Sequence, residues 1–138
     1  MNELEKMLRV FELFTTALGG STKDGKILGA LWMKGGPMSV YEISDATNLS
    51  LTACRNALER LERHYIIKRV KKRGDRKVYY TCEKDITKTI KKVFERLYED
   101  LGVASGIMKG FDGGEDLKLE IDRARRYIER ILGGDLNA

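Results

Sequence analysis

The stretch SVYEISDATNLSLTACRNALERLERHYIIKRVKKRGDRKVYYTC, residues 39–82, decides the fold. It reads as two short helices joined by a tight turn, followed directly by two strands with a lysine- and arginine-rich turn between them. In a helix-turn-helix with a β-wing, the second helix can enter a DNA major groove while the basic ribbon beside it holds phosphate. The sequence therefore predicts a mainly α (α+β) fold, a winged helix-turn-helix.

Local signals mark both helices of this segment. Ser39 and Glu42 have the spacing of a capping box, in which a hydroxyl and a carboxylate each satisfy a backbone N–H at the helix start. Asn48 can adopt the left-handed conformation that a tight turn between helices needs, and Ser50 can cap the second helix. The second helix then separates into two faces. Its buried face is predicted to carry Cys54, Ala57, Leu58 and Leu61, and its outer face Leu51, Thr52, Arg55, Asn56 and Glu59.

Basic residues are concentrated in the wing, whose predicted strands 65–70 and 78–82 flank a turn at 73–75. The chain of 138 residues has a formal net charge of +5, but this charge is unevenly spread. Residues 65–77 contain seven lysines and arginines and a single acid, Asp75, which is expected to orient the turn or its neighbour. Because solvated surfaces usually mix charges of both signs, this distribution indicates a polyanionic partner, and double-stranded DNA fits best.

Nine residues are predicted to contact DNA. Thr52, Arg55 and Asn56 lie near the start of the second helix on its outer face, where arginine can bridge guanine O6 and N7 and asparagine can bridge adenine N6 and N7. Ser50 is expected to bind a phosphate or to cap its own helix. Arg76 follows the wing turn and could enter a narrow A/T minor groove, with a surface ion pair as the alternative. The other predicted contacts are Lys71, Lys72, Arg73 and Lys77 of the wing.

Long amphipathic helices flank the winged segment. Residues 3–18 form an apolar stripe that Gly19-Gly20 ends, and residues 85–111 form a second one, about 40 Å long at ~1.5 Å per residue. In the last helix the apolar positions alternate in spacings of four and three, as in a coiled-coil seam. These positions are Leu117, Ile121, Ala124, Ile128 and Ile131.

The flanking helices carry more apolar surface than a single winged-helix core can cover, so we expect a homodimer. The predicted domain organisation is a winged helix-turn-helix DNA-binding domain at residues 21–82, with residues 1–20 and 83–138 as a helical dimerisation region.

Other functional classes find little support in the residues. The sequence contains no nucleophile–base pair, glycine-rich phosphate loop or paired carboxylates, so neither an enzyme nor a catalytic residue is predicted. The single histidine, His64, cannot form a metal site with two distant cysteines, and no metal or cofactor is expected. Cys54 and Cys82 are interpreted as reduced thiols. No apolar run approaches the length of a membrane span and no signal peptide is evident, which predicts a cytoplasmic protein.

The residues KILGALWMKGGPMSVYEISDATNLSLTACRNALERLERHYIIKRVKKRGDRKVYYT, with the long flanking helices, resemble the MarR-type winged-helix regulators. Within them they are similar to the archaeal group of glycine-betaine synthesis regulators (GbsR-like). Asp75-Arg76 matches the acid–arginine signature of the family's wing, whereas Asn48 stands where that family often has glycine. The resemblance covers nearly the whole chain and implies a homodimer, formed by the N- and C-terminal helices, that binds operator DNA. Some relatives release DNA on binding a small molecule, so an effector is an implied partner, although no pocket residue is carried over.

The expected function is therefore that of a sequence-specific DNA-binding transcriptional regulator, a dimeric repressor. Two alternatives remain, a non-specific architectural DNA-binding protein and a winged-helix module that binds protein. Arg55 and Asn56 on the outer helical face favour the regulator, because an architectural protein would be strongly basic over its whole surface.

Overall fold

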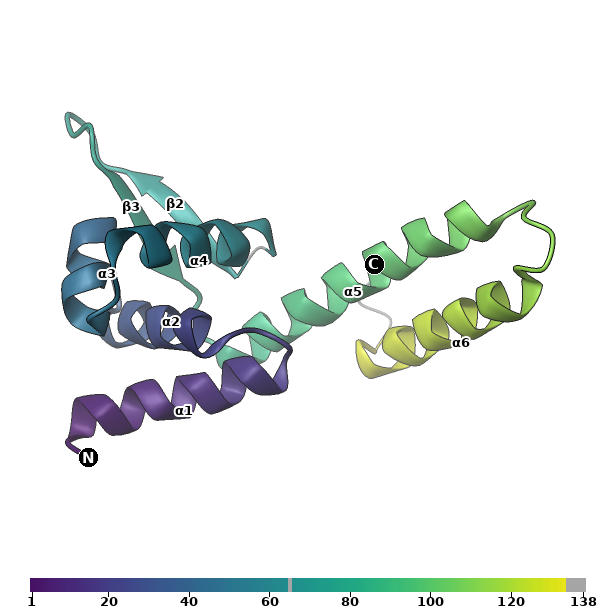
Figure 1. The fold of residues 1–138 in the computed structure, drawn as a ribbon, viewed down its shortest axis with the longest axis horizontal. Coiled ribbons are helices and arrows are strands. Elements are labelled where there is room, and N and C mark those ends of the chain that lie inside the picture. The colour runs from purple at the N-terminus through teal and green to yellow at the C-terminus, as the bar shows by residue number, and fades with distance from the viewer. Residues whose placement is uncertain (65, 134–138) are drawn as a thin grey trace. The chain divides into compact units, whose positions relative to one another are not determined.

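The computed structural model describes residues 1–64 and 66–133, and these fall into two compact units that divide between Ile86 and Thr87 (Figure 1). The first unit contains four helices and three strands among the described residues. They are α1 (Glu3–Ala17), α2 (Thr22–Lys34), β1 (Met38–Ser39), α3 (Val40–Thr47), α4 (Leu51–Arg63), β2 (Ile67–Lys71) and β3 (Val78–Cys82). The second unit contains α5 (Ile86–Met108), which starts at the boundary, and α6 (Glu115–Ile131). The mainly helical winged-helix prediction is confirmed.

The predicted helix starts are confirmed. At α3 the Ser39 hydroxyl accepts from the Glu42 backbone N–H and the Glu42 carboxylate accepts from the Ser39 N–H, each at 3.2 Å. The hydroxyl of Ser50 accepts from the backbone N–H of Ala53 at 3.1 Å and so caps α4. Between the two helices Asn48 has φ 59°, and it is the one non-glycine residue of the described ranges with positive φ. The helix-turn-helix geometry therefore follows from signals that lie close together in the sequence.

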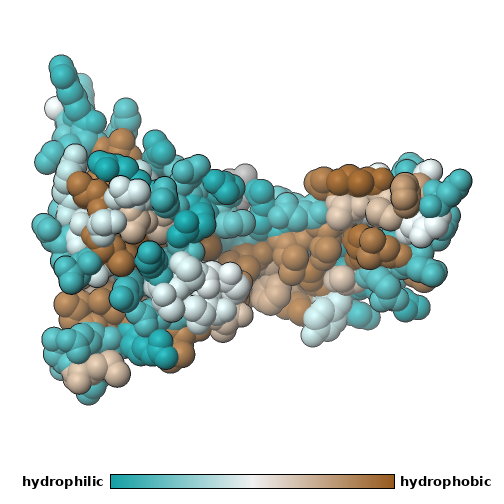
Figure 2. Space-filling view, viewed as in Figure 1, coloured by the Kyte–Doolittle hydropathy of each residue, from teal (hydrophilic) through white to brown (hydrophobic). Residues whose placement is uncertain are grey.

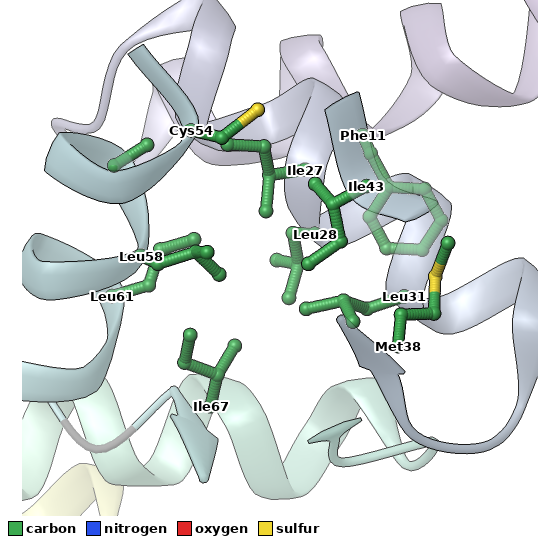
Figure 3. Packing of buried hydrophobic residues seen from close by; sticks show 11 residues of the cluster. Phe11, Ile27, Leu28, Leu31, Met38, Ile43, Cys54, Leu58, Leu61 and Ile67 are labelled. Atoms are coloured by element: carbon green, nitrogen blue, oxygen red, sulfur yellow. The ribbon is translucent and has the colours of Figure 1, made fainter. Parts of the chain in front are cut away.

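The core of the first unit is shared by α1, α2, α3, α4 and the sheet (Figure 3). On α4 the side chains of Cys54, Ala57, Leu58 and Leu61 are buried, as the helical periodicity predicted. The other members of the buried cluster are Phe11, Ile27, Leu28, Leu31, Met38, Ile43 and Ile67. Because α4 buries one complete face here, its opposite face is fixed toward the outside.

Helix α1 packs closely on α2, at two glycines one helical turn apart. A Cβ atom built at Gly25 would lie 2.6 Å from the Cα of Glu12, and one at Gly29 would lie 3.2 Å from the Cβ of Phe11. The backbones of the two helices can approach this closely only because both positions lack a side chain. Helix α1 is thus part of the same compact unit as the helix-turn-helix.

The three strands form an antiparallel sheet in the order β1-β3-β2. Ile67 pairs with Cys82 and Lys71 with Val78, and β1 pairs with β3 through Met38 and Tyr80. Strand β2 starts two residues after the predicted start at 65, and residue 65 itself lies outside the described residues. The β2–β3 hairpin is the predicted wing, and Figure 1 shows its tip extending beyond the helices of this unit.

In the second unit α5 and α6 are joined by polar contacts. The Tyr98 hydroxyl donates to the Glu129 carboxylate at 2.5 Å, and the Ser105 hydroxyl donates to Asp122 at 2.7 Å. The Arg125 guanidinium lies 4.0 Å from the centre of the Tyr98 ring. Helix α5 ends before the predicted residue 111, because Gly110 adopts φ 77°.

Apolar side chains remain exposed on this second unit. Figure 2 shows hydrophobic residues gathered over α5 and α6. Ile107 is 73% exposed, and of the predicted seam in α6 Ile128 is buried while Leu117 and Ile131 are exposed. Exposed apolar residues also occur on α1 of the first unit, where they include Leu4, Val10 and Leu13. A large exposed apolar surface of this kind is typical of protein interfaces.

Candidate DNA-binding surface

The outer face of α4 presents the three residues that were predicted to read bases. Thr52, Arg55 and Asn56 are all exposed in the first two turns, opposite the buried Cys54 and Leu58. Ser50 is also exposed, and its hydroxyl is used as the helix cap, one of the two roles predicted for it. The buried face of α4 fixes the orientation of the helix, so the side chains on its exposed face can enter a major groove without reorganisation of the helix.

The wing turn is fixed by Asp75. One of its carboxylate oxygens accepts from the Lys77 backbone N–H at 2.9 Å, and the other accepts from the Tyr79 hydroxyl at 2.7 Å. The bond from the Lys77 N–H, with that from Tyr79, lowers the pKa of Asp75, so the carboxylate stays ionised at neutral pH. Gly74, with φ 80°, supplies the positive φ of the turn. Asp75 therefore orients the turn, in agreement with one of the two roles predicted for it.

The basic residues of the wing are exposed. Arg76 lies between the two anchored positions 75 and 77, and it forms no ion pair with any described residue. The ammonium group of Lys72 lies 4.2 Å from the centre of the Tyr79 ring. Lys71, Arg73 and Lys77 are likewise exposed, so the wing presents a row of cations to solvent.

Two ion pairs link α4 to other elements of its unit. The Arg69 side chain of β2 contacts the Glu62 carboxylate at 2.7 Å, which raises the pKa of Arg69 and joins the wing to α4. The Arg60 guanidinium contacts the mostly buried Asp24 carboxylate of α2 at 2.8 Å, a hydrogen bond that raises the pKa of Arg60. Sequence reasoning did not anticipate either pair, because helix and strand periodicity give no information about which distant side chains meet.

An open groove lies between the start of α3, the outer face of α4 and the wing. It brings Arg55 of the predicted contacts together with Arg76 and Lys77. The predicted residues Ser50, Thr52, Asn56, Lys71, Lys72 and Arg73 are not part of its lining. The other seven lining residues were not predicted as contacts, and they include Tyr41 at the start of α3 and Glu59 on α4.

The two cysteines have the character of packing residues. Cys54 is fully buried, and burial raises the pKa of its thiol. Desolvation raises the pKa of Cys82 to about 11. At neutral pH both side chains are therefore thiols rather than nucleophilic thiolates.

Within residues 1–64 and 66–133, no cluster of three or more histidine, cysteine, aspartate or glutamate residues could hold a metal ion. The described helices also include none with the length and apolar character that crossing a membrane requires. His64 is an exposed residue at the C-terminal end of α4, where its backbone N–H donates to the Arg60 carbonyl.

Comparison with solved structures shows the fold that surrounds this surface. A structure described as a transcriptional regulator has a TM-score of 0.70 at 14% identity, covering 94% of this chain and 90% of that one. A variant of Staphylococcus aureus MepR bound to an oligodeoxyribonucleotide has a TM-score of 0.51 at 16% identity, covering 89% and 88%. NadR in complex with 4-hydroxyphenylacetate has a TM-score of 0.50 at 17% identity, covering 91% and 86%.

A protein-family model adds evidence from the sequence itself. The model described as "Winged helix-turn-helix DNA-binding" matches residues 21–72, which span α2, β1, α3, α4 and β2. No curated protein matches the sequence significantly. The family match and the architecture agree on the same segment, so residues 21–72 have the winged helix-turn-helix fold of the structures that this DNA-binding family model describes.

Proposed function

We propose that the protein is a dimeric, sequence-specific transcriptional regulator of the MarR type, similar to the archaeal GbsR-like group, and that it acts in the cytoplasm as a repressor. The observation that carries this proposal is the outer face of α4, where Arg55 and Asn56 are exposed beside the basic wing and backed by a fully buried face. The matched DNA-binding family and the fold shared with transcriptional regulators support it.

In the proposed complex Thr52, Arg55 and Asn56 contact base edges in the major groove. Arg76 enters the adjacent minor groove, where it responds to groove width. The phosphate contacts come from Ser50, Lys71, Lys72, Arg73 and Lys77, and these hold the protein in register on the duplex.

Selection of binding sites from random duplexes tests this assignment. Arg55→Ala is expected to weaken binding by about 1–3 kcal/mol per half-site and to relax the preference at one base position, because a bidentate contact to guanine is lost. Arg76→Ala is expected to weaken binding mainly to sites flanked by narrow A/T tracts.

Lys23→Ala provides the control for Arg55→Ala, since Lys23 is an exposed cation near the start of α2, outside the proposed DNA-binding surface and the proposed dimerisation region. It should leave both affinity and base preference unchanged. If Arg55→Ala kept the wild-type preference at every position, Arg55 would not read a base.

We further propose that residues 21–82 bind DNA and that residues 1–20 and 83–138 make the dimer. The exposed apolar side chains on α1, α5 and α6 support this division, because a second copy of the chain could cover them. Light scattering at micromolar concentration is expected to give about twice the chain mass of 15.7 kDa.

Changing Val103 and Ile107 together to aspartate should shift this mass toward the monomer, because both are exposed apolar residues of α5. Lys109→Asp adds an acid nearby at an exposed, already charged position and should leave the dimer intact. A monomer mass for the wild type would contradict the proposal.

Two other functions predict different results. A non-specific architectural protein would bind random and genomic DNA equally in competition, whereas the regulator should prefer a subset of genomic sites. A protein-interaction module would lack DNA affinity even at low salt. We also propose a small-molecule effector, in line with the complex of NadR with 4-hydroxyphenylacetate, whose fold is similar.

A further inference from the structure

The groove between the start of α3, α4 and the wing is lined by Arg55, Arg76 and Lys77 and also by Tyr41, which the proposed base and wing contacts do not use. We propose that this groove binds the sugar–phosphate strand that runs between the major groove entered by α4 and the minor groove reached by the wing. In this complex the Tyr41 hydroxyl donates a hydrogen bond to a phosphate oxygen of that strand. This inference rests on the proposed function and adds a contact surface to it.

The position of the groove is the first argument. In B-DNA a major groove and the next minor groove are separated by one sugar–phosphate strand. If the outer face of α4 lies in the major groove and Arg76 lies in the next minor groove, that strand must pass between α4 and the wing. The groove is lined on one side by Arg55 of α4 and on the other by Arg76 and Lys77 of the wing, so it lies on that path.

The charge of the lining is the second argument. Arg55, Arg76 and Lys77 form no ion pair with any described residue. The two remaining charged residues of the lining each form an ion pair with a residue outside the groove. Glu59 pairs with Arg63 at 3.1 Å, and Arg69 pairs with Glu62 at 2.7 Å. Three cations without an ion-pair partner among the described residues therefore line the groove, which suits an anionic strand.

Tyr41 is the third argument. It is the second residue of α3 and 52% exposed. Its hydroxyl has no hydrogen-bond partner among the described residues, whereas the neighbouring Ser39 hydroxyl and Glu42 carboxylate are both used in the capping box. That box fixes the start of α3 and with it the position of Tyr41. Tyrosine hydroxyls are common donors to DNA phosphates.

The experiment combines protein variants with neutralised phosphates. A duplex that the wild type selects is prepared as a series, each member carrying one uncharged methylphosphonate in a half-site or its flank. Tyr41→Phe should weaken binding by roughly 2- to 12-fold, as expected for one hydrogen bond, and by the same factor on random duplex. One methylphosphonate replaces the phosphate that lies between the bases read by α4 and the minor-groove flank. This replacement should lower the affinity of the wild type by a larger factor than it lowers the affinity of Tyr41→Phe.

Lys77→Ala tests the same phosphate-binding groove by removing a charge. Its effect on affinity should be non-additive with neutralisation of the same phosphate or of the neighbouring one. It should also reduce the slope of log affinity against log salt by about 0.9 per protomer, whereas Tyr41→Phe, which changes no charge, should leave that slope unaltered. Thr22→Ala is the control, because it removes an exposed hydroxyl at the start of α2, outside the groove and outside the proposed dimerisation region, and it should bind as the wild type does.

Wild-type affinity in Tyr41→Phe, or a loss without coupling to any phosphate in either variant, would overturn this inference and leave the proposed function standing. A wild-type protein that bound no duplex at low salt would overturn both.

Discussion

Raising the salt concentration from 50 to 200 mM is expected to weaken DNA binding by about 10³- to 10⁵-fold, if the two copies together neutralise about six to ten phosphates. The physical reason is the release of counterions from the duplex, which is less favourable when the surrounding salt is concentrated. The exposed cations of the wing, with Arg55 on α4, can supply this number of contacts in a dimer. Titration of a labelled duplex at several salt concentrations measures the slope.

The variant with Lys71 and Lys72 both changed to alanine should have a flatter slope and should bind all sequences more weakly by a similar factor. These lysines are exposed at the end of β2, and the proposal gives them phosphate contacts only. Lys23→Ala, at an exposed position near the start of α2 outside the proposed surface, is the control. An affinity that stayed constant from 50 to 200 mM would mean that the wing does not lie on DNA.

Replacement of Leu58 by alanine is expected to lower the free energy of unfolding by about 2–5 kcal/mol. The side chain of Leu58 is 2% exposed, and it packs in the cluster that joins α4 to α2, α3 and the sheet. Its truncation removes buried apolar contacts and leaves a cavity that rigid neighbours fill only in part. Denaturant unfolding followed by fluorescence is suitable, because the single tryptophan, Trp32, packs against the same cluster.

Thr52→Ala is the control, since Thr52 lies on the exposed face of the same helix and its truncation leaves no cavity. Its stability should remain within about 0.5 kcal/mol of the wild type, whereas its DNA binding should weaken. If Arg55→Ala instead lost stability while keeping its base preference, the assignment of the two faces of α4 would be wrong.

The features that sequence reasoning predicted correctly depend on residues close together in the chain. The two faces of α4 follow from the helical period, and the capping box of Ser39 and Glu42 follows from a spacing of three. Asn48 could be placed in the turn because few other residues adopt its conformation at low cost. In each case the signal is local, and the tertiary structure does not override it.

The features that were missed join side chains from different helices and strands. The ion pair of Arg69 with Glu62 crosses from strand to helix, and that of Arg60 with Asp24 connects two helices. Tyr41 is an ordinary exposed residue until the groove places it beside the wing. Contacts between side chains of different helices and strands depend on how these elements pack, and the periodicity of the sequence does not specify that packing.

The glycine contact between α1 and α2 has a mechanical consequence. The backbone of α1 lies directly against Gly25 of α2, so the two helices are in close contact there. Helix α2 is in turn linked to α4 by the ion pair of Asp24 with Arg60, so a continuous series of contacts joins α1 to α4. A partner copy holding the exposed side of α1 would thereby set the distance between the two reading helices. Operators whose half-sites are one base pair too near or too far should then be rejected, although every individual base contact remains available.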